Sequence, residues 1–303
     1  MKICRIITRL NVGGPARQVK VLKDLPGVET LVLAGRCEDG EREMFEPDVR
    51  IEGLGREIGL WNDWKAYRGI KRVLREFRPD LVHTHTSKAG AIGRVAAWRC
   101  GVPCVHTYHG HVFHSYFGRV KTEVVKLVEK GLCGISSRVV AISHSQLEEI
   151  GEVIGRAKLT LIWNGFDLRP FLQEQEVERD KWSLFVDRNA PIKRRDRFVK
   201  YLRDNNLKGV IANGEFSTKQ MAWLYKRAKE LVICSDNEGV PTCYIEAVAS
   251  WCPVKLLTCP GGVVDLVKMS REDILSVFRP ERLKEDLLKL YKEVLDENSR
   301  NRR

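Results

Sequence analysis

Short apolar runs alternate with amphipathic segments along most of the chain. The runs are rich in β-branched residues and end in glycine, proline or polar residues, which is typical of buried strands. They predict strands at residues 2–7, 30–34, 80–85, 104–107, 138–143, 159–162, 183–186, 209–212, 231–234 and 255–257. Helical spacing of apolar residues predicts helices between them, at residues 16–25, 61–77, 89–100, 119–133, 196–203, 218–229 and 282–295.

This alternation of strand and helix predicts an α/β protein with two facing, doubly wound, Rossmann-like domains. We expect an N-terminal domain at residues 1–168 and a C-terminal domain at residues 181–280. The highly charged stretch from residue 170 to residue 180 is typical of a linker. The C-terminal helix, residues 281–297, is a candidate to pack back on the first domain. Residues 38–56 are polar and show no regular period.

One strand, loop and helix stand out near the centre of the second half, at residues 231–254. Turn-forming residues from Ser235 to Gly239 follow the apolar strand, and Pro241 lies near the first turn of the next helix. Thr242 is a candidate cap, and Pro253 stops the helix. In an open parallel sheet, the loop that leaves the carboxyl end of a strand is where ligands bind.

Two carboxylates mark this segment. Glu238 lies in the loop, and Glu246 lies eight residues later inside the apolar helix. A carboxylate among apolar residues needs a partner, because burying it unpaired costs free energy. The vicinal hydroxyls of a sugar or ribose are one such partner. A neighbouring loop or an arginine is an equally good one, and the spacing alone leaves both open.

A second candidate loop follows the first strand. Gly13 and Gly14 stand directly before a predicted helix, and glycine lets the backbone approach a ligand closely. The segment lacks the spacing of either a dinucleotide-binding fingerprint or a phosphate-binding P-loop. A tight structural turn therefore explains these glycines equally well.

Histidines cluster in the first half of the chain. Six of the seven lie between His83 and His114, mostly at the ends of predicted strands. Such a cluster fits proton transfer, polar ligand contacts or a metal site. There is no HExxH motif and no regular Cys/His ligand spacing, so we expect no metal and expect some of these histidines to be core residues.

Composition adds a basic surface to this picture. The 303 residues carry a formal net charge of +12, with 43% hydrophobic and 30% charged residues. The charge suggests an anionic partner: a nucleotide phosphate, an acidic lipid or a nucleic acid. No recognition helix, zinc spacing or aromatic RNA-binding motif supports nucleic acid. The nine cysteines form no CxxC pair, which favours reduced thiols in a cytoplasmic protein.

The sequence shows no signal peptide and no apolar run of membrane-spanning length, so any membrane contact is expected to be peripheral. The helix at residues 119–133 is basic, and an aromatic loop with His111, Phe113 and His114 precedes it. Such a loop and helix could hold a lipid-linked acceptor at an anionic membrane. A packed loop and a solvated helix face are the alternative.

Several of these segments, taken in order, resemble the retaining glycosyltransferases of family 4, which have the two-domain GT-B fold. The matching motifs are Gly13-Gly14 with Arg17, Pro79–His85, the His109 segment, Val140–Ser143, Asn164–Asp167, Arg188 with Lys193, Glu238–Pro241 with Glu246-Ala247, and Pro260–Gly262.

The resemblance implies transfer of a sugar from a nucleotide diphosphate sugar to a glycan or lipid-linked acceptor. The anomeric configuration would be retained, with no metal or other cofactor. Glu246 would bind the ribose hydroxyls, and Glu238 the donor-sugar hydroxyls. Arg188 and Lys193 would clamp the diphosphate and neutralise the charge that develops as it leaves. The other implied donor-binding residues are Gly13, Gly14, Arg17, Asn164, Gly239, Val240 and Pro241, with His109 near the reacting carbon.

The chain also departs from the family pattern. Asp187 stands where the family usually has a glycine before the motif arginine, and the second half is short. These departures leave an inactive relative as an alternative, and a nucleotide-sugar epimerase is a second alternative because it shares the same fold and cleft. The sequence does not identify the base, the sugar or the acceptor.

Overall fold

The computed structural model describes residues 1–111, 113, 118–172, 178–187, 190–214 and 216–301. The chain divides into two compact units, which are described separately. Unit 1 comprises Met1–Gly165 and Pro280–Arg303, and unit 2 comprises Phe166–Arg279. The division falls between Gly165 and Phe166, ahead of the charged stretch that resembles a linker. Within that stretch Phe171 is 1% exposed and packs against Tyr225 of unit 2.

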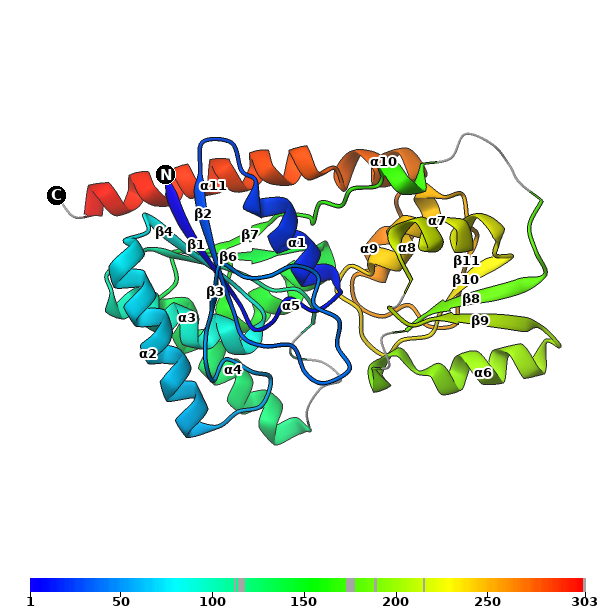
Figure 1. Cartoon of the computed structure of the whole chain (residues 1–303), viewed down its shortest axis with the longest axis horizontal. Coiled ribbons are helices and arrows are strands. Elements are labelled where there is room, and N and C mark those ends of the chain that lie inside the picture. Colours follow the sequence, from blue (N-terminus) through cyan, green and yellow to red (C-terminus); the bar gives the residue numbers. More distant parts are fainter. Residues whose placement is uncertain (112, 114–117, 173–177, 188–189, 215, 302–303) are drawn as a thin grey trace. The chain divides into compact units, whose positions relative to one another are not determined.

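In the described part of unit 1, a parallel sheet has the strand order β3-β2-β1-β4-β5-β6-β7 (Figure 1). Its strands are β1 (Lys2–Ile7), β2 (Glu29–Ala34), β3 (Val49–Arg50), β4 (Leu81–His85), β5 (Cys104–Thr107), β6 (Arg138–Ala141) and β7 (Leu159–Leu161). Its helices are α1 (Gly14–Lys23), α2 (Leu60–Phe77), α3 (Ser87–Arg99), α4 (Arg119–Gly134), α5 (His144–Ile154) and α11 (Pro280–Asn301).

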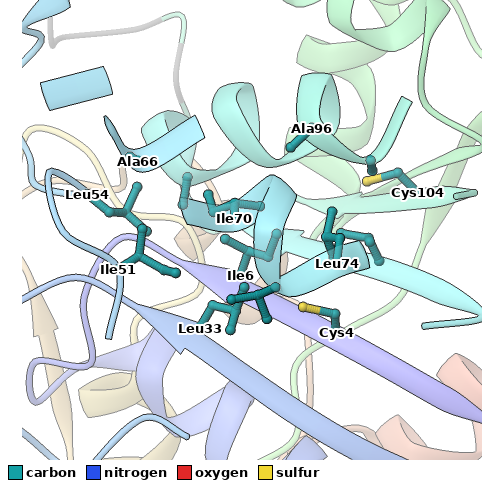
Figure 2. Close-up of a cluster of buried hydrophobic side chains, with 14 residues drawn as sticks. Cys4, Ile6, Leu33, Ile51, Leu54, Ala66, Ile70, Leu74, Ala96 and Cys104 are labelled. Carbon is teal, nitrogen blue, oxygen red and sulfur yellow. The ribbon is translucent and has the colours of Figure 1, made fainter. Parts of the chain in front are cut away.

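Helices cover both faces of this sheet because its strands are apolar on both sides. Figure 2 shows the cluster on the face under α2 and α3, where Ile70 and Leu74 of α2 pack over Ile6 and Leu33 of the strands. Helix α3 comes very close to the sheet at Gly90, where an added Cβ would lie 2.4 Å from a ring carbon of His106. Close approach to the sheet therefore requires glycine there.

The opposite face is covered by α1 and α11. Leu287 and Tyr291 of α11 pack with Ile3 and Val105 of the strands. The Tyr291 hydroxyl lies 2.5 Å from Nδ1 of His83 and accepts a hydrogen bond of 3.0 Å from Arg5. The C-terminal helix is thus joined to unit 1 by both apolar and polar contacts.

Unit 2 is built on a smaller parallel sheet with the order β11-β10-β8-β9. Its described strands are β8 (Trp182–Val186), β9 (Lys208–Ala212), β10 (Glu230–Ile233) and β11 (Val254–Leu256). Its helices are α6 (Arg195–Asp204), α7 (Thr218–Arg227), α8 (Thr242–Ala249), α9 (Val263–Leu266) and α10 (Arg271–Val277), with short 3₁₀ helices η1 (Arg169–Phe171) and η2 (Pro191–Lys193). Phe198 of α6 stacks on Phe185 of β8, so that α6 packs against the sheet.

The parallel α/β class expected from the sequence is confirmed. Among the described elements, β3, α5, α9, α10 and the two 3₁₀ helices η1 and η2 were not predicted. The expectation that Thr242 caps its helix is wrong. Thr242 is the first helical residue of α8, and Pro241 occupies the cap position without a side-chain hydrogen bond.

Candidate functional site

The strand order of each sheet reverses at one point, and in open parallel sheets ligands bind in the crevice outside the strand ends there. In unit 2 the reversal falls between β8 and β10. Lys193 ends the short helix η2 that follows β8, and Glu238 lies in the loop that follows β10. The topology therefore brings these two predicted site residues to the same edge.

Lys193 and Glu238 form an ion pair in this structure. Nζ of Lys193 lies 2.5 Å from Oε1 of Glu238, and the two side chains are 12% and 11% exposed. The Ser235 hydroxyl donates a second hydrogen bond of 2.7 Å to the same carboxylate oxygen. A lysine is a point charge suited to phosphate, and a carboxylate accepts hydrogen bonds from hydroxyls. The switch point thus carries a cation suited to phosphate and a carboxylate suited to sugar hydroxyls.

The two loops that carry this pair are fastened to each other. The backbone N–H of Asp236 donates to the carbonyl of Ile192 at 2.9 Å. Its carboxylate pairs with Arg194 at 3.0 Å and with Arg197 at 2.6 Å. Burial acts to raise the pKa of Asp236, but hydrogen bonds from both arginines lower it overall. The loop after β8 and the loop after β10 therefore form one connected structure.

Asp187, the acid that replaces the family's usual glycine, is paired within the same unit. It is 2% exposed, and its carboxylate receives hydrogen bonds from Arg195 at 2.8 Å and from the backbone of Ala190 at 3.1 Å. Arg195 compensates the charge of this acid beside the candidate phosphate site. Arg188 lies outside the described residues.

Glu246 lies inside α8 and is only 3% exposed. Its Oε2 accepts a hydrogen bond of 3.0 Å from the Tyr225 hydroxyl of α7. A structural partner is therefore present, but it is a tyrosine hydroxyl on a helix and not the neighbouring loop or arginine that the sequence analysis considered. Gly239, Val240 and Pro241 join the Glu238 loop to the start of α8.

In unit 1, His109 follows β5 and lies beside His85 at the end of β4. Nδ1 of His85 is 3.0 Å from Nε2 of His109, and the rings stack at 5.2 Å. Both histidines line a small cavity of about 10 Å³, together with His83 and Asn164. A cavity of this size holds about one water molecule.

Burial sets the charge of these histidines. It lowers the pKa of His109 to about 4 and holds the pKa values of His83 and His85 well below the usual value. These imidazoles are therefore neutral near pH 7. Nδ1 of His109 and Nε2 of His85 have no hydrogen-bond partner within the described ranges. Neutral His109 can donate to or accept from a hydroxyl.

Three further predicted residues lie at the start of α1. Gly13 is the N-cap, Gly14 is the first helical residue, and the Arg17 backbone donates to the Gly13 carbonyl at 3.0 Å. The switch point of this sheet lies between β1 and β4, which places these residues at the edge where ligands bind.

The sequence analysis missed a threonine pair at the same switch point. Thr86 has φ 65° and ψ 157°, a region that is strained for residues other than glycine. Its hydroxyl lies 2.7 Å from that of Thr8, and the Thr8 backbone N–H donates to it at 3.3 Å. Strain of this kind clusters at functional sites, but no sequence pattern marks it here.

The proposed acceptor loop is packed wherever the structure describes it. His111 pairs with Glu149 of α5, and the same carboxylate accepts from the Phe113 backbone at 3.2 Å. The Phe113 ring is 6% exposed and packs with Cys133 and Ile150. His114 lies outside the described residues. These contacts favour the packed-loop interpretation.

The described ranges contain neither a cluster of metal ligands nor a membrane-spanning helix. No group of three or more His, Cys, Asp or Glu side chains there could hold a metal ion. None of the helices there combines the length and apolar character needed to cross a bilayer.

Comparison with known structures defines the class first. The chain is similar to sucrose-phosphate synthase from Thermosynechococcus elongatus, at 16% identity and a TM-score of 0.74, over 98% of this chain and 99% of that one. It is similar to Anabaena Alr3699/HepE in complex with UDP, at 14% identity and a TM-score of 0.69, over 97% and 100%. The protein thus has a GT-B type fold. A UDP-GlcNAc 2-epimerase from Methanocaldococcus jannaschii shares it at 14% identity and a TM-score of 0.59, over 97% and 100% of the two chains, so the fold alone does not separate transferase from epimerase.

Sequence similarity to one family covers about half of the chain. Residues 20–169 match Glycosyltransferase Family 4. Over 147 residues, 46% of this chain, the sequence is 37% identical to an Escherichia coli enzyme named UDP-Gal:alpha-D-GlcNAc-diphosphoundecaprenol alpha-1,3-galactosyltransferase. The match covers 35% of that relative's own length. With the GT-B neighbours, these matches support a family 4 glycosyltransferase of the GT-B type.

Proposed function

We propose that this chain transfers a sugar from a nucleotide diphosphate sugar to a lipid-linked acceptor, with retention of anomeric configuration and without a metal. The observation that carries the proposal is the Lys193–Glu238 pair at the switch point of unit 2. Two similarities support it: a GT-B neighbour is a complex with UDP, and the Escherichia coli relative is named for a diphosphoundecaprenol acceptor.

The pair would exchange partners when the donor binds. A phosphate oxygen would replace Glu238 as the partner of Lys193, and the Glu238 carboxylate would then accept hydrogen bonds from donor-sugar hydroxyls. Lys193, with Arg188, would neutralise the negative charge that grows on the departing diphosphate. Fixed charges placed in this way lower the barrier most, because they need no reorganisation during the reaction.

Retention needs no protein base in this scheme. The bond between the anomeric carbon and the phosphate oxygen breaks, and the acceptor oxygen bonds to that carbon on the same face. The acceptor proton passes to the departing diphosphate. Glu246 would bind the ribose hydroxyls, and neutral His109 would hydrogen-bond a sugar hydroxyl.

The test is transfer itself. UDP-, GDP- and ADP-sugars would be incubated with vesicles that carry a polyprenyl-diphosphate sugar, and nucleoside diphosphate release would be measured with and without EDTA. We expect release with one base, insensitivity to EDTA, and a product whose anomeric configuration by NMR matches the donor. Lys193→Met should lower the rate about a hundredfold or more. Lys200→Met is the matched control, because Lys200 is exposed and forms an ion pair along its own helix with Asp204.

Each alternative gives a different result in the same assay. An epimerase would convert the nucleotide sugar without any acceptor, and an inactive relative would release nothing from any donor. An inverted product or loss of rate in EDTA would contradict the mechanism proposed here.

A further inference from the structure

Helix α4 is apolar on two sides. Its inner side packs Leu132 and Cys133 against the unit. On the outer side Val120, Val124, Leu127 and Val128 recur at helical spacing and are 80%, 56%, 71% and 50% exposed. A helix on the surface of a globular protein normally carries polar residues on its outer side. This stripe therefore has no covering element among the described residues.

The start of α2 carries a second exposed apolar group. Ile58 is 90% exposed, Leu60 93%, Trp61 65% and Trp64 45%. The two indole rings stack at 5.1 Å, and the Arg68 guanidinium lies 4.7 Å from the Trp64 ring. Stacked, exposed tryptophans beside arginine match the side chains enriched where proteins meet the bilayer interface.

Both groups belong to the same end of unit 1. Helices α2, α3 and α4 each lead into the next strand of a parallel sheet, so each begins near the carboxyl ends of the strands. Lys88, near the start of α3, pairs with Asp63 of α2 at 2.6 Å and ties these two starts together. We call the α2 group and the α4 stripe together the apolar rim. It lies at the sheet edge that carries His109.

Positive charge flanks the α4 stripe of the apolar rim. Arg119, Lys121 and Lys130 are exposed on α4 and flank the apolar stripe on both sides. The acids nearest them in sequence are already paired, Glu123 with Lys126 at 2.8 Å and Glu129 with the buried Arg94 at 2.7 Å. An apolar stripe with basic margins is the arrangement by which interfacial helices bind anionic bilayers.

We propose that the apolar rim docks unit 1 on an anionic bilayer surface. The rim side chains enter the boundary between headgroups and acyl chains, while the flanking cations contact anionic headgroups. A lipid-linked acceptor would then reach the sheet edge without leaving the membrane. Delivery of a lipid-linked acceptor rests on the proposed function, whereas membrane docking itself needs neither donor nor acceptor.

The test is sedimentation with phosphatidylcholine vesicles, with and without phosphatidylglycerol and with no acceptor present. We expect binding to the anionic vesicles that weakens with salt. Trp61→Gln/Trp64→Gln and Val124→Gln/Leu127→Gln should each lower the partition coefficient about tenfold or more. These side chains are exposed, so the variants should keep the wild-type circular dichroism spectrum and melting temperature.

Trp98→Gln is the matched control. Trp98 is 52% exposed beside Arg99, but it lies near the C-terminal end of α3, at the opposite edge of the sheet. The Trp98→Gln variant should bind vesicles as the wild type does. Equal binding by the rim variants, or no binding by the wild type, would overturn the proposal. A dimer in light scattering that the rim variants abolish, without vesicle binding, would reassign the rim to contact between copies. If the wild type does not bind vesicles but still transfers sugar to a soluble acceptor analogue, the docking proposal fails and the proposed function stands.

Discussion

At the scale of single residues, Glu246 has a structural contact and a proposed role in ligand binding. Its carboxylate accepts from Tyr225 inside unit 2, and the proposed function gives it the ribose hydroxyls as well. The two duties can be separated, because the tyrosine hydrogen bond belongs to the fold and the ribose contact belongs to the ligand. Variants at the two residues should therefore have different signatures.

We predict that Glu246→Gln removes discrimination between a ribonucleoside diphosphate and its 2′-deoxy form. The reason is that the variant loses the carboxylate that accepts from the 2′-hydroxyl, the group by which the two nucleotides differ. Tyr225→Phe should keep the discrimination and lower the free energy of unfolding by about 1 kcal/mol. Calorimetric titration and chemical denaturation measure the two effects. A Glu246→Gln variant that discriminates as the wild type does would confine Glu246 to a structural role.

His109 makes stability depend on pH. Burial lowers its pKa from 6.5 to about 4, so unfolding takes up a proton between these values. Its contribution to stability is complete above pH 6.5 and is lost as pH falls through about 4. His109→Asn should reduce the slope of unfolding free energy against pH near pH 5 by about 1 kcal/mol per pH unit. An unchanged slope in His109→Asn would contradict the assignment.

At the scale of elements, the close approach of α3 to its sheet depends on Gly90. Gly90→Ala would place a Cβ 2.4 Å from a His106 ring carbon and should lower the free energy of unfolding by about 1–3 kcal/mol. Gly131→Ala in α4 meets no atom within 4 Å and should raise it by up to about 1 kcal/mol. Chemical denaturation compares the two, and equal effects would contradict this packing.

The loop between β8 and α6 depends on the Asp187–Arg195 pair. Arg195→Ala leaves a carboxylate that is 2% exposed without its cation and should cost about 1–3 kcal/mol. Asp187→Gly/Arg195→Ala restores the family's usual residue and should recover most of that loss. A double variant no more stable than Arg195→Ala would show that the pair is not coupled.

Regular periods made most elements predictable. The apolar runs of β1 and β10 and the helical spacing of α2 were visible in the sequence, as was the breaker Pro79 before β4. Strand β3 was missed because two residues show no period, and α9 and α10 because they are short. Helix α5 was also missed, although the Ser143 hydroxyl caps it by accepting a hydrogen bond from the Gln146 backbone.

At the scale of the whole molecule, sheet order is what the sequence could not supply. The positions of Lys193 and Glu238 were found by motif, but their contact follows from β8 and β10 being neighbours. Several partners of the site were also hidden by distance along the chain, because Tyr225 is 21 residues from Glu246 and Thr8 is 78 residues from Thr86. Arg195 was missed although it is only eight residues from Asp187. The sequence indicated a membrane-facing role only for the helix at residues 119–133. It did not show that the apolar residues at the start of α2 are exposed, because that depends on how α2 packs on the sheet.

The central claim is that the switch point of unit 2 binds a nucleoside diphosphate through Lys193. Calorimetric titration of UDP, GDP and ADP into the wild type, Lys193→Met and Lys200→Met tests it most directly. The account predicts binding of one nucleotide by the wild type and by Lys200→Met, with affinity at least about tenfold lower in Lys193→Met. Equal affinity in all three proteins, or no binding of any nucleotide by the wild type, would contradict it.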